Sequence, residues 1–141
     1  MERKKYELVK EDTMVFRGRK LYRVRYLVDI PYRCRVGEIG GYIEREENLS
    51  QEGECVVLDN AMVCENAVVQ GAGVVANNAC IFGNAVVQDC GVVEDECTVS
   101  DDCVIEGRVS GSMKIKDDVY IMDGVIISGD GILNGSCDIK G

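Results

Sequence analysis

Cysteines and carboxylates are the side chains of this chain that could carry out chemistry, because its 141 residues include no histidine. Cys64 and Cys80 could act as nucleophiles only if a neighbouring group lowered the pKa of the thiol, and nothing near them in the sequence does so. A zinc site would need closely spaced ligands, and no CxxC pair or histidine partner occurs. The eight cysteines are Cys34, Cys55, Cys64, Cys80, Cys90, Cys97, Cys103 and Cys137. We therefore name no catalytic residue and expect no metal and no cofactor.

A six-residue repeat organises the chain from Glu54 to Gly107. Written in sixes, this segment reads ECVVLD, NAMVCE, NAVVQG, AGVVAN, NACIFG, NAVVQD, CGVVED, ECTVSD and a shortened DCVI. The fourth residue is always valine or isoleucine, and the second is alanine, glycine or cysteine. In an extended segment these two side chains share one face, and Asn, Asp and Gly at the junctions favour sharp corners. The repeat therefore predicts a parallel β-helix, since an α-helix would need an apolar period near 3.6.

The limits of the repeat predict two parts. Nine sixes run from Asn48 to Asp101, four residues follow to Ile105, and six further sixes end at Gly141. The two-residue skip near 105 predicts a shortened corner. Residues 1–47 lack the repeat, and two strand-like runs around Gly18 predict a β-hairpin. We therefore predict an all-β fold with an N-terminal hairpin cap over residues 1–47 and a solenoid over residues 48–141.

The repeat resembles that of the hexapeptide-repeat proteins, whose chains wind as a left-handed parallel β-helix of triangular section. The resemblance implies three sixes per turn, so that Val57, Val75 and Val93 stack as one inner ladder. Three further segments are GGYIE at residues 40–44, ENLSQEG at residues 47–53 and YRVR at residues 22–25. In these segments the chain also resembles a narrower set, the YdcK-like group of bacteria, phages and prophages, often classed as transferases by fold.

The resemblance implies a transferase, but the composition argues against one. Hexapeptide-repeat acyltransferases typically use a histidine as general base, and the related γ-class carbonic anhydrases bind zinc through three histidines. No position of this chain can receive either role, and a solvated glutamate at its ordinary pKa is a weak base. We therefore favour a non-enzymatic protein. The alternative is a transferase that uses an acyl-CoA or nucleotide-sugar donor.

Charge is divided unevenly between the two parts. Residues 1–47 contain twelve Lys/Arg and nine Asp/Glu, a net charge of +3, whereas residues 48–141 contain four and sixteen, a net charge of −12. Regularly spaced carboxylates could imitate a phosphate backbone and occupy the basic groove of a nucleic-acid enzyme. They could instead simply keep a β-protein soluble. The candidate partner-binding residues are Asp89, Glu94, Asp95, Glu96, Asp101, Asp102 and Glu106.

Basic side chains in the N-terminal part form a second set of candidates. They are Arg17, Arg19, Lys20, Arg23, Arg25, Arg33 and Arg35. These residues could contact nucleic acid or an acidic partner, but basic residues on a hairpin more often face solvent. We therefore expect a protein partner rather than nucleic acid.

The outward positions of the repeat are unusually apolar. The third and fifth residues of each six point outward, and contiguous apolar residues on a surface usually mark an interface. We therefore predict a homo-oligomer, either a dimer or a trimer. The candidate self-association residues are Val56, Leu58, Met62, Val74, Phe82 and Val92.

Three hypotheses for the function follow from these features. The first is a phage- or prophage-encoded module that presents an acidic β-helix to a protein partner and possesses no enzymatic activity. The others are the transferase and a self-assembling scaffold.

No apolar run is long enough to span a membrane, and the segment MERKKYELVKED lacks the apolar core of a signal peptide. We therefore expect no membrane contact and a cytoplasmic location, in the bacterial host cytosol if a phage encodes the chain.

Overall fold

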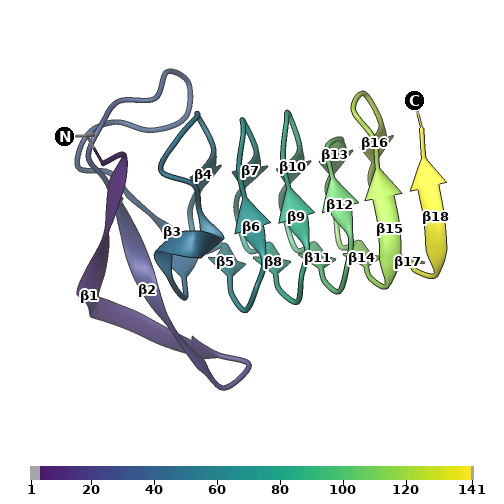
Figure 1. Cartoon of the computed structure of the whole chain (residues 1–141), viewed down its shortest axis with the longest axis horizontal. Helices are drawn as coiled ribbons and strands as arrows, with labels where there is room; N and C mark the ends of the chain where they lie inside the picture. Colours follow the sequence, from purple (N-terminus) through teal and green to yellow (C-terminus); the bar gives the residue numbers. More distant parts are fainter. Residues whose placement is uncertain (1–3, 141) are drawn as a thin grey trace.

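A parallel β-solenoid of about five turns makes up most of the computed structural model, which describes residues 4–140 (Figure 1). Its strands are short because each six contributes only two extended residues before the chain turns. They lie in three parallel sheets, and successive turns add one strand to each sheet. This arrangement confirms the prediction of an all-β solenoid.

The strands of the three sheets recur in a fixed order along the chain. The solenoid part of the first sheet comprises β5 (Met62–Val63), β8 (Cys80–Ile81), β11 (Thr98–Val99), β14 (Lys114–Ile115) and β17 (Ile132–Leu133). The second comprises β4 (Val56–Val57), β7 (Val74–Val75), β10 (Val92–Val93), β13 (Arg108–Val109) and β16 (Ile126–Ile127). The third comprises β6 (Val68–Val69), β9 (Val86–Val87), β12 (Val104–Ile105), β15 (Asp118–Ile121) and β18 (Ser136–Ile139).

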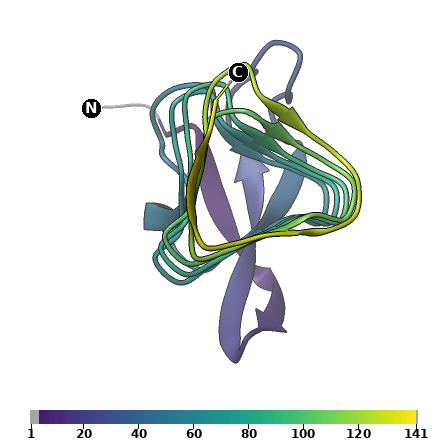
Figure 2. The ribbon, with the colours of Figure 1, turned by 90° about the vertical axis from the view of Figure 1, so that its right-hand side faces the viewer.

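The chain passes from one sheet to the next at three corners in each turn. Equivalent corners of successive turns stack along the solenoid axis, as Figure 2 shows, and form three edges of the solenoid. Edge 1 joins the second sheet to the first at residues 58–61, 76–79 and 94–97, and at the equivalent later positions. Edge 2 joins the first sheet to the third at residues 64–67, 82–85 and 100–103. Edge 3 joins the third sheet to the second at residues 70–73, 88–91 and 106–107.

Register along the solenoid shows one shortened turn. Val74 pairs with Val56 on one side and with Val92 on the other, a spacing of eighteen residues. Val92 then pairs with Arg108, only sixteen residues further on, and the first and third sheets show the same sixteen-residue step. The two residues are missing from edge 3, where the backbone N–H groups of Glu106 and Gly107 both donate to the carbonyl of Ile121.

The interior of the solenoid is the apolar column that the repeat predicts. Val57, Val75 and Val93 are fully buried and stack through the paired strands. Burial of an aliphatic side chain of this size stabilises a fold by roughly 1.5–3 kcal/mol. The solenoid is therefore stabilised by the same contribution at each turn.

An N-terminal hairpin extends the first sheet beyond the solenoid. β1 (Tyr6–Phe16) pairs antiparallel with β2 (Arg19–Tyr26), which pairs with β3 (Ile39–Ile43), and β3 runs parallel to β5. A short 3-10 helix, Glu46–Asn48, leads into the first turn.

Buried polar side chains of this N-terminal part form hydrogen bonds with backbone groups of the first turn. The Tyr26 hydroxyl donates to the carbonyl of Val57 and accepts the Val57 N–H, both at 2.8 Å. The Lys5 ammonium donates to the carbonyl of Cys55 at 2.7 Å. Without these hydrogen bonds, the backbone groups of the first turn would form an unpaired sheet edge, which exposes donors and acceptors to other chains.

Candidate binding surface

The seven predicted acidic residues lie around the circumference of the solenoid, because they span about one turn. Asp89 and Glu106 lie at edge 3, Glu94, Asp95 and Glu96 at edge 1, and Asp101 and Asp102 at edge 2. Stacking brings together residues one turn apart, not residues one six apart. The structure therefore divides these candidates among three edges and does not gather them on one face.

Corner carboxylates hold successive turns together. Asp95 and Asp101 adopt left-handed backbone conformations, with φ of 61° and 59°. Each carboxylate accepts the backbone N–H of the corner residue one turn later, Gly111 for Asp95 and Asp117 for Asp101, both at 2.9 Å. Aspartate tolerates this conformation better than most residues. These two side chains therefore have a structural role, although each is exposed.

Three of the other carboxylates each accept a hydrogen bond from an amide side chain one turn earlier. At edge 1, the Asn78 amide donates to Glu96 at 3.2 Å, and at edge 2 the Asn84 amide donates to Asp102 at 3.1 Å. At edge 3, Gln88 donates to Glu106 at 2.7 Å. Glu96 and Asp102 are exposed, whereas only 8% of the Glu106 surface is accessible. Glu106 is therefore mainly an internal acceptor.

Two further acidic candidates have charged neighbours. The carboxylate of Glu94 forms an ion pair with Arg108 at 2.8 Å. Glu106 raises the pKa of the neighbouring Asp89, because two negative charges near one another disfavour ionisation. Of the seven candidates, five are exposed and form no ion pair with any residue in the described range 4–140, namely Asp89, Asp95, Glu96, Asp101 and Asp102.

Arginines at the tip of the hairpin form ion pairs with the first turns of the solenoid. Arg17 and Arg19 reach Glu65 at 3.3 and 3.6 Å, and Arg19 also reaches Glu44 at 2.9 Å. The backbone N–H of Gly83, and then Arg17 and Arg19, lower the pKa of Glu65. The charges of these two arginines are therefore already paired with carboxylates of the same chain.

Other arginines of the N-terminal part bind backbone carbonyls or nearby acids. Arg23 donates to the carbonyls of Gly40 and Asp59, and Arg33 donates to those of Glu54 and Ala72. Arg25 forms an ion pair with Glu7 at 3.0 Å. Lys20 and Arg35 remain exposed. Five of the seven basic candidates are thus engaged within the chain.

The N-terminal hairpin also covers part of the predicted self-association surface. Val56 is fully buried in the core. The ring of Phe82 packs edge-on against Phe16 at 6.0 Å and lies 4.0 Å beneath the Arg17 guanidinium. Leu58, Met62, Val74 and Val92 are half-buried. The apolar surface left to another copy is therefore smaller than the repeat suggested.

Burial favours the protonated form of three cysteine thiols, those of Cys64, Cys80 and Cys103. It raises the pKa of Cys64 to about 12, with the Glu65 carboxylate adding to the effect, and that of Cys103 to about 11. The pKa of Cys80 is raised for the same reason. A thiolate is the reactive form, so these cysteines are not activated. Among residues 4–140, no group of three Cys, Asp or Glu side chains is arranged to hold a metal ion.

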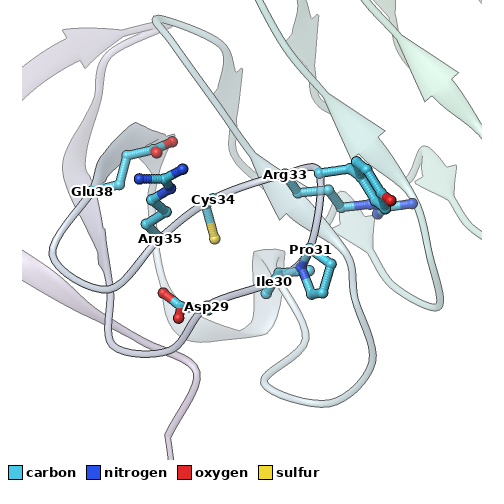
Figure 3. A pocket seen from close by; sticks show the side chains of 8 residues that line it. Asp29, Ile30, Pro31, Arg33, Cys34, Arg35 and Glu38 are labelled. Carbon is cyan, nitrogen blue, oxygen red and sulfur yellow. The ribbon is translucent and has the colours of Figure 1, made fainter.

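Sequence reasoning did not single out the connection between β2 and β3, which carries the most exposed aromatic ring of the chain. Tyr32 is fully exposed, and Val36 and Ile39 are 60% and 45% exposed. An open hollow of about 700 Å³ lies against this connection (Figure 3). Its lining residues are Asp29, Ile30, Pro31, Tyr32, Arg33, Cys34, Arg35 and Glu38. The only signal in the sequence was the single proline, Pro31, followed by a tyrosine.

Three smaller hollows continue from this connection along edge 3. The first, of about 280 Å³, lies between Pro31 and Glu54, and the second, of about 390 Å³, between Glu52 and Asp89. The third, of about 290 Å³, adjoins Gly107 at the shortened corner. A Cβ at Gly107 would lie 2.4 Å from the carbonyl of Val125, so the corner requires glycine. Edge 3 is therefore the indented side of the molecule.

Neither a scan of protein-family models nor a search of curated proteins found a match to this chain. Between Lys4 and Lys140, no helix has the length and apolar character needed to cross a membrane.

Proposed function

We propose that the chain is a non-enzymatic binding module that presents its acidic solenoid turns to a basic surface of a protein partner. The observation that carries this proposal is the charge of residues 48–107, which contain eleven Asp/Glu and no Lys/Arg. Within this segment the hairpin arginines form ion pairs with Glu65 alone. The exposed carboxylates Asp95, Glu96, Asp101 and Asp102 of edges 1 and 2 therefore form no ion pair with the hairpin arginines.

Rigidity supports the same proposal. Interturn hydrogen bonds at the corners hold the carboxylates in fixed positions, for example Asp101 through the Asp117 N–H. A rigid acidic surface loses little entropy on binding and attracts a basic partner over long distances at low salt. Repeated carboxylates along a solenoid edge would suit a protein whose own ligand is a phosphate backbone. The partner class that we propose is therefore a nucleic-acid enzyme, which the module would inhibit by charge mimicry.

Capture of partners by charge variants tests the proposal. The tagged chain would be used to isolate partners from bacterial lysate, with identification by mass spectrometry at low and at high salt. The test variant is D95N/E96Q/D101N/D102N, whose amide oxygens can still accept the corner hydrogen bonds. The control is D118N/D123N/D130N/D138N, which removes the same charge from exposed positions further along the solenoid.

We expect a stoichiometric nucleic-acid-binding protein that is captured by the wild type and the control, and is lost with the test variant. High salt should also release it, because exposed charges are screened over about 3 Å at 1 M ionic strength and about 10 Å at 0.1 M. Retention of that partner by the test variant would overturn the proposal.

Self-association is a second candidate, favoured by exposed side chains on later turns. Ile126 and Ile132 are 73% and 58% exposed on neighbouring sheets. Light scattering over a range of concentrations would show a dimer or trimer that the variant I126S/I132S loses. A monomer at all concentrations would exclude this candidate.

A further inference from the structure

Tyr32 combines an unfavourable backbone conformation with a completely solvent-exposed ring. Its φ is 66°, in the left-handed region that bulky residues rarely adopt. The residue is fully exposed, so no packing within the chain compensates the strain. A strained residue of this kind costs on the order of 1–3 kcal/mol and persists only when its surroundings enforce it.

The surroundings of Tyr32 do enforce its position. The carbonyl of Ile30 accepts the N–H groups of Arg33 and Cys34 at 2.9 and 3.0 Å, which closes a turn with Pro31 and Tyr32 at its centre. Proline followed by a residue with positive φ is the arrangement of a type II turn, whose third position normally holds glycine. Here that position holds tyrosine.

Both flanks of the turn are fixed to the body of the protein. Ile30 and Cys34 are 5% exposed and belong to the hydrophobic core. The Arg33 guanidinium donates to the carbonyls of Glu54 and Ala72 at 2.7 and 2.9 Å, which joins the turn to edge 3 of the first two solenoid turns. The ring of Tyr32 is therefore presented by a rigid support, so little additional ordering is needed for it to bind.

Charge around this ring indicates the kind of surface that would accept it. Acidic side chains at Asp29, Glu38, Glu52 and Glu54 are exposed. The nearby cations are Arg35, which is exposed, and Arg33, whose guanidinium is already bound to two carbonyls. Aromatic residues in the centre of an interface are frequent hot spots, and a surrounding rim of charge gives specificity.

We propose that Tyr32 is the anchor residue of the interface, inserting into an apolar pocket with a basic rim on the partner protein. The contact surface then includes edge 3, from Tyr32 past Glu54 and Glu52 towards Asp89, in addition to the carboxylates of edges 1 and 2 that the same partner contacts. This inference rests on the proposed function, because it assumes the same basic protein partner. It adds the site of apolar contact, which charge alone does not provide.

Photo-crosslinking from position 32 identifies what the ring touches. A chain with the substitution Tyr32→p-benzoylphenylalanine would be irradiated in bacterial lysate, with the same substitution at Val15 as the control. Val15 is 72% exposed on the hairpin and distant in sequence. We expect an adduct with a basic protein from position 32 and not from position 15. No adduct, equal adducts from both positions, or an adduct with a second copy of this chain would overturn the inference.

Affinity measurements with the crosslinked protein, purified without crosslinking, complete the test. Tyr32→Gly suits the backbone conformation and removes the ring, and we expect it to weaken binding on the order of 30-fold. Tyr32→Phe and Val15→Ala should remain within about threefold of the wild type, a difference too small for a hot spot. The variant E52Q/E54Q should slow association at low salt and have little effect at high salt.

The two proposals fail in different ways. Loss of binding by D95N/E96Q/D101N/D102N with full binding by Tyr32→Gly would overturn the anchor and leave the acidic module standing. Loss of binding by Tyr32→Gly with full binding by the charge variant would overturn the charge-mimicry proposal and show only that Tyr32 contacts the captured protein.

Discussion

The solenoid corners and the turn at Tyr32 use the same left-handed backbone conformation for different ends. At Asp95 and Asp101, φ is 61° and 59°, and at Tyr32 it is 66°. Each aspartate belongs to a residue type that tolerates this conformation, and its carboxylate binds the N–H of the next turn. Tyr32 belongs to a type that does not, and its fully exposed side chain packs against nothing in the chain. Folding explains the corner residues, whereas nothing within residues 4–140 explains Tyr32, which is why we propose that it contacts a partner.

Placing tyrosine at a corner should have the largest effect on stability. We expect Asp101→Tyr to lower the free energy of unfolding by about 2–4 kcal/mol, which combines backbone strain of about 1–3 kcal/mol with the loss of one hydrogen bond. Chemical denaturation monitored by circular dichroism measures this change. A loss below about 1 kcal/mol would show that the corners tolerate bulky residues and that Tyr32 is not exceptional.

Glycine at the same corner separates the two contributions. Asp101→Gly suits the backbone conformation, removes the acceptor of the Asp117 N–H and adds chain entropy to the unfolded state, so we expect a loss of about 1–2.5 kcal/mol. Asp101→Asn, which keeps an acceptor oxygen, is the matched control and should lie closer to the wild type. Equal losses for the two variants would indicate that the charge and not the hydrogen bond stabilises the corner.

Glycine at position 32 should have the opposite sign. Tyr32→Gly relieves strain of about 1–3 kcal/mol and adds chain entropy to the unfolded state worth about 0.5–1 kcal/mol. We therefore expect the free energy of unfolding to rise by up to about 2.5 kcal/mol, and Tyr32→Phe to leave it unchanged. A clear loss of stability in Tyr32→Gly would mean that the ring contributes to folding after all.

Dependence on pH should give the smallest effects, and opposite signs at edges 2 and 3. The pKa of Glu65 is lowered in the folded protein, so its contribution to stability is present at neutral pH and lost as pH falls through that folded pKa. The pKa of Asp89 is raised, so its contribution is complete below its unfolded pKa and lost as pH rises through the folded pKa.

Melting temperatures of two amide variants check these signs. At neutral pH, Glu65→Gln should melt below the wild type and Asp89→Asn above it. Both differences should shrink in acid, where the carboxylates are protonated in the folded and unfolded chains. A lower melting temperature for Asp89→Asn at neutral pH would contradict the repulsion between Asp89 and Glu106.

Local pattern predicted the solenoid well and its binding surface poorly, for one physical reason. Alternation within each six determines which side chains face inward, so Val57 and Val75 could be assigned to the core from neighbouring residues alone. Neighbours across a turn are eighteen residues apart, and sixteen at the shortened corner. The acidic residues of one turn therefore look adjacent in the sequence although they occupy three edges.

The hairpin arginines and Tyr32 show the same limit outside the repeat. Arg17 and Glu65 are distant in sequence, and only the return of the hairpin along the first sheet brings them together. Tyr32 lies in a connection without periodicity, where exposure and backbone conformation follow from the anchoring of Ile30, Arg33 and Cys34. No local pattern reports such anchoring.

By itself, the sequence determined the parallel β-solenoid, its buried aliphatic column, its acidic charge and the lack of histidine, because each depends on residue type or on alternation between neighbours. Tertiary structure alone decided which carboxylates share an edge, which arginines are already paired, and that Tyr32 stands exposed beside edge 3. Those properties arise from contacts between residues far apart in the chain, and such contacts exist only once the turns have stacked.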